Sequence, residues 1–494
     1  MKNKVIAIDQ STSATKAMLF SGQCKLIRRS NVCHEQYYPK AGWVEHDAEE
    51  IYRNVLLSVG KLMDAEPAGE NNDYSLCITN QRETVVVWNK DTGKPVYNAI
   101  VWQCLRGAAI CNRLKEEGHS QMVREKTGLL IDPYFSASGV KWILDNVEGA
   151  RRYAAKGLLL MGTIDSWLIW KLTNGRVHAT DYTNASRTLL FNIHTLDWDD
   201  DMLNLFTVPR SMMPQPHPCD SVFGETTVGG IFKRPVCIAG AIGDSHAALA
   251  GQMCFEEGLG KATYGTGSSV MVNTGGKAVA APKGLVTSIG FHALGKISYA
   301  FEGNIHCTGA TINWIENQLG IISSPAEIEC MVSQIGCNDG VYFVPAFTGL
   351  GAPWWQPDVK AAIFGMTLAT GKMHIIRAAI ESIAYQVNDL VKTMQQSVTL
   401  KELRADGGGT KNNLLMQFQA DLLRTPVNCL DIEEASALGA VIMNGFARNV
   451  WSAFADIQAM STYGSGKLFL PEVSEDIMNT AYTGWLNAVK QLIK

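Results

Sequence analysis

The sequence has no excess of charge of either sign. Its 494 residues include 43 Lys and Arg against 47 Asp and Glu, which gives a net charge of −4. Proteins that bind the phosphate backbone of nucleic acids normally carry a clear basic excess, so we expect no nucleic acid partner. Hydrophobic residues make up 46% and charged residues 18%, which excludes a wholly disordered or coiled-coil chain. A globular protein of about two to four domains is expected.

Long apolar segments and paired-cysteine motifs are also missing. The most apolar stretch, residues 158–170, contains Asp165 and is too short to cross a bilayer. No long apolar segment precedes the strand-like residues that begin at Val5. No two of the 12 cysteines have the Cys-x-x-Cys spacing of zinc or thioredoxin-like sites. We therefore expect a soluble protein of the reducing cytoplasm, without membrane insertion.

Strand-like and helix-like segments alternate along the chain, which predicts an α/β fold. Glycine is abundant, with 45 residues, and this indicates tight turns or backbone contacts with a ligand. Two pairs of strands are expected to form hairpins in the first hundred residues, and two amphipathic helices are expected later. The pairs are 5–9 with 16–20 and 75–79 with 84–88, and the helices are 374–394 and 412–423.

A domain boundary is predicted near residue 250, because a new strand-rich stretch begins at Gly258. The two expected domains are residues 1–250 and 251–494. No low-complexity segment or long Pro/Ser linker separates them, so we expect the halves to pack closely and share a cleft. Each half begins with strands joined by Ser/Thr/Gly-rich turns, which suits a duplicated domain.

Three turns carry the residue types that bind phosphates. In the turn 9–16, hydroxyl side chains and backbone N–H groups could contact phosphate oxygens, and Asp9 could hold Mg²⁺ through water. The others are 265–269 and 406–410, and the last leads into a helix whose N-terminus favours anions. Each turn is also common in proteins that bind no nucleotide. Their joint presence indicates a nucleotide site.

A second set of residues could hold a polyol. Asp244 is expected between a strand (236–241) and a helix (247–253), where it could accept the proton of an attacking hydroxyl or merely cap the helix. Arg82 and Glu83 could hold vicinal hydroxyls, or they could form an exposed charged turn. The rings of Trp102 and Tyr134 could lie against carbon atoms of a substrate, or they could belong to the core.

Several segments together resemble one enzyme family. They are YYPKAGWVEHDAEEIY, ITNQRETVVVWNKDTGKPVYNAIVWQC, TDYTNASRTLLFNIHTLDWDD and VPAFTGLGAPWW. They are similar to the FGGY family of carbohydrate kinases, and within it to the glycerol kinases, from about Val5 to about Trp451. Residues 361–382 resemble the family's C-terminal signature. The resemblance implies an α/β fold of two ribonuclease-H-like domains, of the actin and hexokinase type, with an ATP cleft between them.

The same resemblance implies roles for individual residues. Asp244 would be the catalytic base, and Asp9 and Asp244 would hold Mg²⁺. The acceptor pocket would contain Arg82, Glu83, Trp102, Tyr134, Asp244, Ser245 and Ser269. The ATP site would contain Thr12, Ser13, Lys16, Thr266, Gly309, Asn313, Gly408, Gly409 and Asn412.

The expected reaction is phosphorylation of a terminal hydroxyl of a small polyol by ATP, with glycerol as the default acceptor. Glycerol kinases generally have Asp-Gln-Gln where this chain has Asp244-Ser245-His246, and Phe where it has Ser269. Both changes would widen the pocket and make it more polar, so a four- or five-carbon polyol or ketose is the alternative acceptor. A non-catalytic ATP-binding sensor of the same fold is a further alternative. We expect a homo-oligomer, either a dimer or a tetramer.

Overall fold

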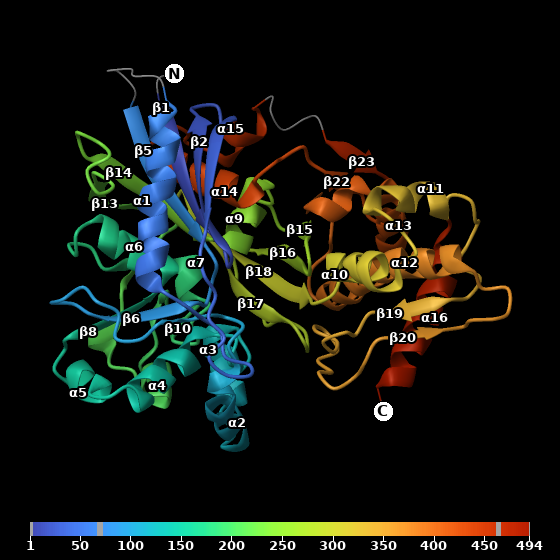
Figure 1. Ribbon diagram of the computed structural model, residues 1–494, viewed down its shortest axis with the longest axis horizontal. Coiled ribbons are helices and arrows are strands. Elements are labelled where there is room, and N and C mark those ends of the chain that lie inside the picture. The colour runs from blue at the N-terminus through green and yellow to red at the C-terminus, as the bar shows by residue number, and fades with distance from the viewer. Residues whose placement is uncertain (1–2, 67–72, 461–465, 494) are drawn as a thin grey trace.

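The structure is a computed structural model that describes residues 3–66, 73–460 and 466–493. Two sheets form its framework, one in each half of the chain (Figure 1). In the described residues the first sheet has the strand order β13 (Val222–Thr226), β14 (Val236–Gly243), β5 (Asp73–Asn80), β1 (Asn3–Gln10), β2 (Ala14–Ser21) and β3 (Leu26–Cys33). The second has the order β17 (Val286–Ala293), β18 (Lys296–Ile305), β16 (Ser268–Gly275), β15 (Leu259–Tyr264), β21 (Glu402–Asp406), β22 (Val427–Cys429) and β23 (Lys467–Phe469).

Smaller sheets and helices surround this framework. The short strands are β4 (Glu45–His46), β6 (Val85–Asn89), β7 (Ala99–Ile100), β8 (Leu159–Thr163), β9 (Ala179–Asp181), β10 (Phe191–Asn192), β11 (Asp197–Trp198), β12 (Gln215–His217), β19 (Tyr342–Val344) and β20 (Ala362–Phe364). The helices before residue 260 are α1 (Ala48–Asp64), α2 (Ala108–Glu116), α3 (Ser120–Thr127), α4 (Ser136–Asn146), α5 (Ala150–Ala155), α6 (Ile164–Leu172), α7 (Tyr182–Ala185), α8 (Asp200–Phe206) and α9 (Asp244–Gly251). Those after it are α10 (Gly309–Trp314), α11 (Ile328–Val332), α12 (Lys372–Met394), α13 (Asn413–Leu423), α14 (Ala435–Ala447), α15 (Phe454–Gln458) and α16 (Glu475–Leu492).

Three neighbouring strands of the first sheet bring the expected site residues to one edge. Strands β14, β5 and β1 are parallel, so their carboxyl ends meet at the same edge of the sheet. Asp9 lies at the end of β1, and β5 ends at Asn80, two residues before Arg82. Strand β14 ends at Gly243, and Asp244 is the next residue. The register pairs Asn80 with Gly243, which places Arg82 and Asp244 close together.

One expected hairpin is wrong. Strands β1 and β2 do pair in antiparallel fashion, as predicted, but β5 and β6 do not pair. Strand β6 belongs to a separate four-stranded sheet with β4, β7 and β8. The connecting residues Arg82 and Glu83 are only 5% and 3% exposed, and Glu83 has φ +63°. Because both charged side chains are held inside the protein, the segment leads from one sheet to another instead of forming an exposed reversal.

The predicted helices are present, with one change of boundary. Helices α12 and α13 lie where the apolar spacing predicts them, and the side chain of Asn412 caps α13 by accepting a hydrogen bond from Leu415 N at 2.9 Å. Helix α9, however, begins at Asp244, three residues before the expected start, and Gly243 is its N-cap. Asp244 is therefore the first residue of the helix.

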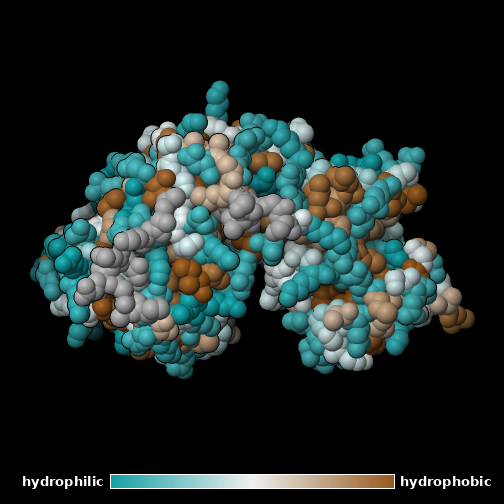
Figure 2. All heavy atoms as spheres, turned by 90° about the horizontal axis from the view of Figure 1, so that it is seen from above, coloured by the Kyte–Doolittle hydropathy of each residue, from teal (hydrophilic) through white to brown (hydrophobic). Residues whose placement is uncertain are grey.

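The two halves of the chain share part of their core. Helix α14 comes from the second half but packs on α9, β14, β5 and β1 of the first half, as Figure 1 shows. One buried apolar cluster combines residues of both halves, such as Leu249, Phe291 and Val441. Figure 2 shows a notch that separates two lobes at the lower edge of the view. No helix in the described part of the chain is long and apolar enough to cross a membrane.

Candidate active site

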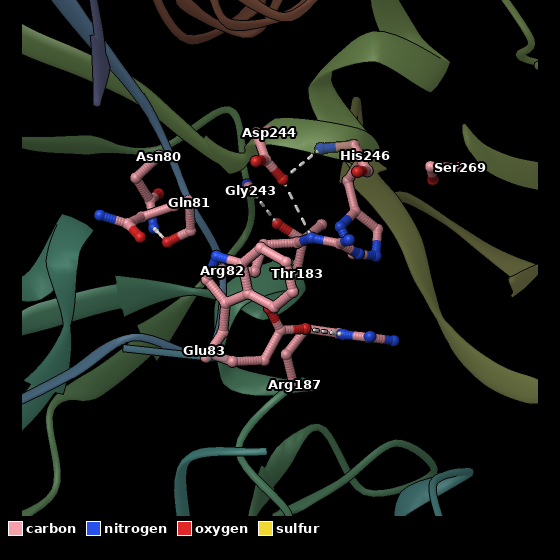
Figure 3. Close-up of polar contacts among 12 residues, drawn as sticks. Asn80, Gln81, Arg82, Glu83, Thr183, Arg187, Gly243, Asp244, His246 and Ser269 are labelled. Carbon is pink, nitrogen blue, oxygen red and sulfur yellow. Dashed lines mark hydrogen bonds and ion pairs between the residues drawn. The ribbon is translucent and has the colours of Figure 1, made fainter. Parts of the chain in front are cut away.

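Asp244 is held at the first turn of α9 by two donors. Arg82 Nε donates to Asp244 Oδ1 at 3.0 Å, and Ser245 N donates to the same oxygen at 2.6 Å (Figure 3). The side chain of Asp244 is 37% exposed, so the carboxylate also reaches solvent. Gly243 N donates to Thr183 Oγ1 at 2.9 Å, which fixes the backbone just before Asp244. The carboxylate thus has one fixed oxygen and remains open to an incoming hydroxyl.

Arg82 and Glu83 belong to a buried ion cluster. Arg82 Nη1 and Nη2 donate to Glu302 Oε2 and Oε1 at 3.0 and 2.8 Å. Arg187 Nε donates to Glu83 Oε1 at 2.6 Å, and Arg187 Nη1 lies 2.7 Å from Glu302 Oε2. Burial alone would raise the pKa of Glu302, but Arg187 and Arg82 hold it well below its usual value. The reading of Arg82 and Glu83 as an exposed charged turn is therefore wrong.

The two expected aromatic residues are in contact. The rings of Trp102 and Tyr134 meet edge to face with centroids 5.5 Å apart. Trp102 Nε1 donates to Thr12 Oγ1 at 3.0 Å, which links this ring to the turn between β1 and β2. Burial raises the pKa of Tyr134, and the negative charge of Glu83 raises it further. Trp102 and Tyr134 therefore form a wall between the buried ion cluster and the first of the predicted phosphate-binding turns.

Asp9 and Asp244 form a pair of carboxylates that could hold a cation. Burial raises the pKa of Asp9 to about 7, against the effect of Lys16, and the charge of Asp244 adds to the rise. A divalent cation would relieve this repulsion, so the residues present fit Mg²⁺. No group of three or more His, Cys, Asp or Glu side chains among the described residues could hold a metal. Water and phosphate oxygens would have to complete the shell, as is usual for Mg²⁺.

The expected nucleotide residues of the second half converge. Ala310 N donates to Thr266 O at 3.0 Å and Gly309 N to Gly265 O at 2.9 Å, so the turn 265–268 lies against the start of α10. Gly407 has φ +90°, and a Cβ there would lie 2.5 Å from Tyr264 O. This contact brings the turn 407–409, with Gly408, Gly409 and the cap Asn412, to the same place. Asn313 is exposed on α10.

The residues of the turn between β1 and β2 lie on the other sheet. Ser13 is exposed and Thr12 is half-buried. Lys16 does not point freely into the turn, because its Nζ pairs with Glu434 Oε2 at 2.9 Å at the start of α14. Thr12, Ser13 and Lys16 therefore belong to the first sheet and its turn, whereas the convergent group belongs to the second sheet.

The two serines that distinguish this chain differ in their surroundings. Ser245 follows Asp244 directly and is half-buried. Ser269 Oγ accepts a hydrogen bond at 3.1 Å from Nζ of Lys261. Lys261 is buried, and its burial lowers its pKa. Figure 3 shows Ser269 beyond His246, apart from the group around Arg82.

Four residues of the site were not found from the sequence: Thr183, Arg187, Lys261 and Glu302. Arg187 and Thr183 lie in the segment TDYTNASRTLLFN, whose pattern alone assigns them no partner. A lone carboxylate within the apolar strand segment SYAFEGN was the available signal for Glu302, because a buried charge needs a partner.

Comparison with known proteins identifies the family. The profile of the FGGY family of carbohydrate kinases, N-terminal domain, matches residues 4–251, and that of its C-terminal domain matches residues 260–448. The chain is 47% identical to a glycerol kinase of Bacillus subtilis (strain 168) over 492 residues, covering 99% of both chains. It is 49% identical to glycerol kinase 1 of Thermotoga maritima over 491 residues, again covering 99% of both.

A solved structure, that of Plasmodium falciparum glycerol kinase with ADP, superposes with a TM-score of 0.94 at 34% identity and covers 100% of this chain and 98% of that one. The expected fold, with two α/β domains of the actin and hexokinase type, is confirmed. The fold that carries Asp244 and the glycine turns is thus shared with a solved glycerol kinase structure. This chain belongs to the FGGY family of carbohydrate kinases.

Proposed function

We propose that this enzyme transfers the terminal phosphoryl group of ATP to a primary hydroxyl of glycerol, giving glycerol 3-phosphate and ADP. The full-length similarity to glycerol kinases supports glycerol as the acceptor. The single observation that carries the chemistry is the carboxylate of Asp244, fixed by Arg82 and partly open to solvent. A carboxylate in this state can accept the proton of an attacking hydroxyl.

The acceptor would bind between the ion cluster and the aromatic pair. Arg82 uses three of its five N–H groups on Asp244 and Glu302, so two remain for hydroxyl oxygens of the acceptor. Glu83 Oε1 is engaged by Arg187, which leaves Oε2 to accept a hydroxyl proton. Trp102 and Tyr134 would cover the carbon atoms. These contacts would direct a terminal hydroxyl toward Asp244.

The nucleotide would bind across the notch between the sheets. The backbone at Thr266, Gly309 and Gly408 would contact the nucleotide, and Thr12 and Ser13 would meet its phosphates from the first sheet. Asp9 and Asp244 would hold Mg²⁺. When bound, this ion would neutralise charge on the phosphate oxygens and orient the transferred group.

The test measures ADP release in a coupled assay with glycerol and a panel of C3 to C6 polyols, ketoses and aldoses. We expect turnover with glycerol, and Asp244→Asn should lower kcat at least about a hundredfold, the low end of a general-base contribution. The KM for ATP should change little. Near-parental turnover of Asp244→Asn would remove this residue from the mechanism. Absence of turnover with every acceptor would support the non-catalytic sensor.

A longer acceptor is the second candidate, and the environment of Ser269 favours it. Ser269 Oγ is half-buried and bonded to the ammonium of Lys261, so a pocket that extends from Asp244 as far as Ser269 would have a polar wall there. A ring at this position would cover apolar carbon atoms, whereas a bonded hydroxyl pairs better with further hydroxyls of a four- or five-carbon chain. Ser245, next to Asp244, would add a second hydroxyl.

This candidate predicts that glycerol is a poorer acceptor than erythritol, threitol or a pentitol. Ser269→Phe should then shift the ratio of kcat/KM values toward glycerol by roughly tenfold or more. The measurement is kcat/KM for each acceptor in both proteins. If glycerol exceeds every longer acceptor in the unmodified enzyme, the second candidate is wrong and glycerol stands as the substrate. The oligomeric state stays a prediction that light scattering can check.

A further inference from the structure

Glu302 connects the two sheets at the floor of the candidate site. It lies on β18 of the second sheet, 220 residues beyond Arg82, and its side chain is 1% exposed. Both of its oxygens accept hydrogen bonds from the terminal nitrogens of Arg82, at 3.0 and 2.8 Å. Two parallel bonds of this kind fix the plane of a guanidinium as well as its position. The orientation of Arg82 in the first half is therefore set by a residue of the second half.

The same carboxylate also reaches the second acceptor residue through Arg187. Arg187 Nη1 lies 2.7 Å from Glu302 Oε2, and Arg187 Nε donates to Glu83 Oε1 at 2.6 Å. The side chains of Arg187 and Glu83 are 1% and 2% exposed. Glu302 is thus bonded to Arg82 directly and connected to Glu83 through one intermediate residue.

The geometry leaves Arg82 with two carboxylate partners that compete for it. Nε donates to Asp244, whereas each terminal nitrogen donates one N–H group to Glu302. Without the charge of Glu302, a guanidinium buried at this depth would be left with excess positive charge, and Asp244 is the nearest carboxylate that could compensate it. The Arg82 side chain would then turn toward Asp244 and away from the place where the acceptor hydroxyls bind.

We propose that Glu302 is a positioning residue for the acceptor. It holds Arg82 by both terminal nitrogens and orients Glu83 through Arg187, so that both residues face the acceptor and Asp244 keeps one oxygen free. This role rests on the proposed function, in which Arg82 and Glu83 bind the acceptor. Among the described residues, the hydrogen bonds and ion pairs of Glu302 are with Arg82 and Arg187 and not with the predicted nucleotide residues. We therefore expect its loss to affect the acceptor more than ATP.

The test replaces Glu302 with glutamine, which keeps the shape and removes the charge. We expect kcat/KM for the acceptor to fall about a hundredfold, the effect of misplacing a binding group by about 1 Å, while the KM for ATP stays within about threefold. Glu302→Asp keeps the charge but is too short to bond both nitrogens in the same place, so it should retain about a tenth of the activity.

A matched control is available in Glu381. Its carboxylate is also buried, belongs to the same half of the chain and pairs with an arginine, Arg377, but it lies on α12 outside the ion cluster. Glu381→Gln removes a buried charge without touching the acceptor residues. It should lower the melting temperature while kcat/KM for the acceptor stays within about threefold of the parent.

The outcomes separate the role of Glu302 from the proposed function. An unmodified enzyme that phosphorylates no polyol overturns the function and this role with it. If the parent enzyme is active, two results overturn the role alone. In one, Glu302→Gln keeps kcat/KM for the acceptor within threefold of the parent. In the other, kcat/KM for the acceptor falls and the KM for ATP rises to a similar extent. If Glu302→Gln does not fold, the same comparison is made with Glu302→Asp. Its kcat/KM for the acceptor should fall while its KM for ATP stays within about threefold, and any other result overturns the role.

Discussion

Arg82 shows how burial determines what a charged residue can do. A surface arginine would share its donors with water, but Arg82 is 5% exposed and divides them between Asp244 and Glu302. Burial alone would lower the pKa of Arg82, and Glu302 and Glu83 raise it well above its usual value instead. The guanidinium therefore stays charged although it is buried. The surroundings of each glycine in the predicted nucleotide turns likewise determine what an added side chain would do there.

Gly408 is a position at which an added side chain should weaken nucleotide binding without lowering the stability of the protein. A Cβ at Gly408 meets no atom within 4 Å, so Gly408→Val should leave the fold intact and fill space that the nucleotide needs. We expect the KM for ATP to rise about tenfold or more, equivalent to about 1.4 kcal/mol, with an unchanged melting temperature.

The adjacent Gly409 provides the contrast. A Cβ at Gly409 would lie 2.7 Å from Tyr264 Cβ, so Gly409→Ala should lower the melting temperature as well as ATP affinity. Unchanged ATP affinity in Gly408→Val would exclude this turn from the nucleotide site.

At the scale of elements, the crossing of α9 and α14 positions Asp244, the carboxylate that we propose as the base. Asp244 begins α9, and the helices approach so closely that a Cβ at Gly251 would overlap Ala435 O, while one at Gly439 would overlap Ala247 O. Glycine is needed at both places because the backbones themselves are in contact. The helix that begins with Asp244 is thus packed closely against a helix from the other half of the chain.

Gly439→Ala should therefore destabilise the protein, although alanine is the better helix former. We expect a loss of about 2 kcal/mol or more in the free energy of unfolding, because the helices must separate. Gly60→Ala is the matched control: Gly60 also lies within a helix, α1, but its added Cβ would be 3.8 Å from the nearest atom, Ile231 Cδ1. That variant should gain up to about 1 kcal/mol. Urea unfolding of the two variants and the parent measures these free energies. A Gly439→Ala variant as stable as the parent would contradict the close crossing.

A second contact between elements, the hydrogen bonds to the Asp389 carboxyl group, depends on pH. Asp389 on α12 accepts hydrogen bonds from Trp354 Nε1 at 2.9 Å, Tyr482 OH at 2.6 Å and Trp485 Nε1 at 3.0 Å, which joins α12 to α16 and to the loop that holds Trp354. Burial raises the pKa of Asp389 from 3.8 to about 6, although these three bonds oppose the rise. The folded state therefore binds the proton more tightly than the unfolded state does.

Because the folded pKa is the higher one, the stabilising contribution of Asp389 is complete below its unfolded pKa and is lost as the pH rises through about 6. Between about pH 7.5 and about pH 5, the parent should gain about 1 kcal/mol of stability relative to Asp389→Asn. Urea midpoints of both proteins at the two pH values measure it. A stability difference that does not change with pH would show that Asp389 keeps an ordinary pKa.

The whole molecule depends on contacts between its halves. Asn444 on α14 donates to Leu76 O and Ala239 O at 3.2 and 2.8 Å, and it accepts from Ser75 Oγ at 2.9 Å. These partners lie on β5 and β14, so a buried amide of the second half completes the hydrogen bonding of the first sheet. Ion pairs such as Arg29 with Glu433, at 2.8 Å, add to the same interface.

Residues 1–250 expressed alone should therefore fail to fold cooperatively. Without α14, the apolar faces of β1, β5 and β14 would be exposed to water. We expect dye binding to exposed apolar surface and no sharp thermal transition. Co-expression with residues 251–494 should restore both folding and kinase activity. A sharp calorimetric transition of the isolated fragment would contradict this prediction.

The sequence by itself determined the class of reaction and most local structure. Turn residues and apolar spacing predicted β1, β2, α12 and α13, since these signals arise between residues near one another in the chain. The motifs around Arg82, Asp244 and Gly408 each left a structural alternative open. The kinase reaction and the two-domain fold were predicted from the resemblance of whole segments to the FGGY family. These predictions use the order of residues along the chain and need no knowledge of which residues meet in space.

Only the tertiary structure decided which charges meet. It placed Glu302 against Arg82, turned Lys16 toward Glu434 and sent β6 into a sheet apart from β5. The physical reason is that a buried charge is satisfied by whichever opposite charge the fold brings near, and periodicity along the chain carries no record of that partner.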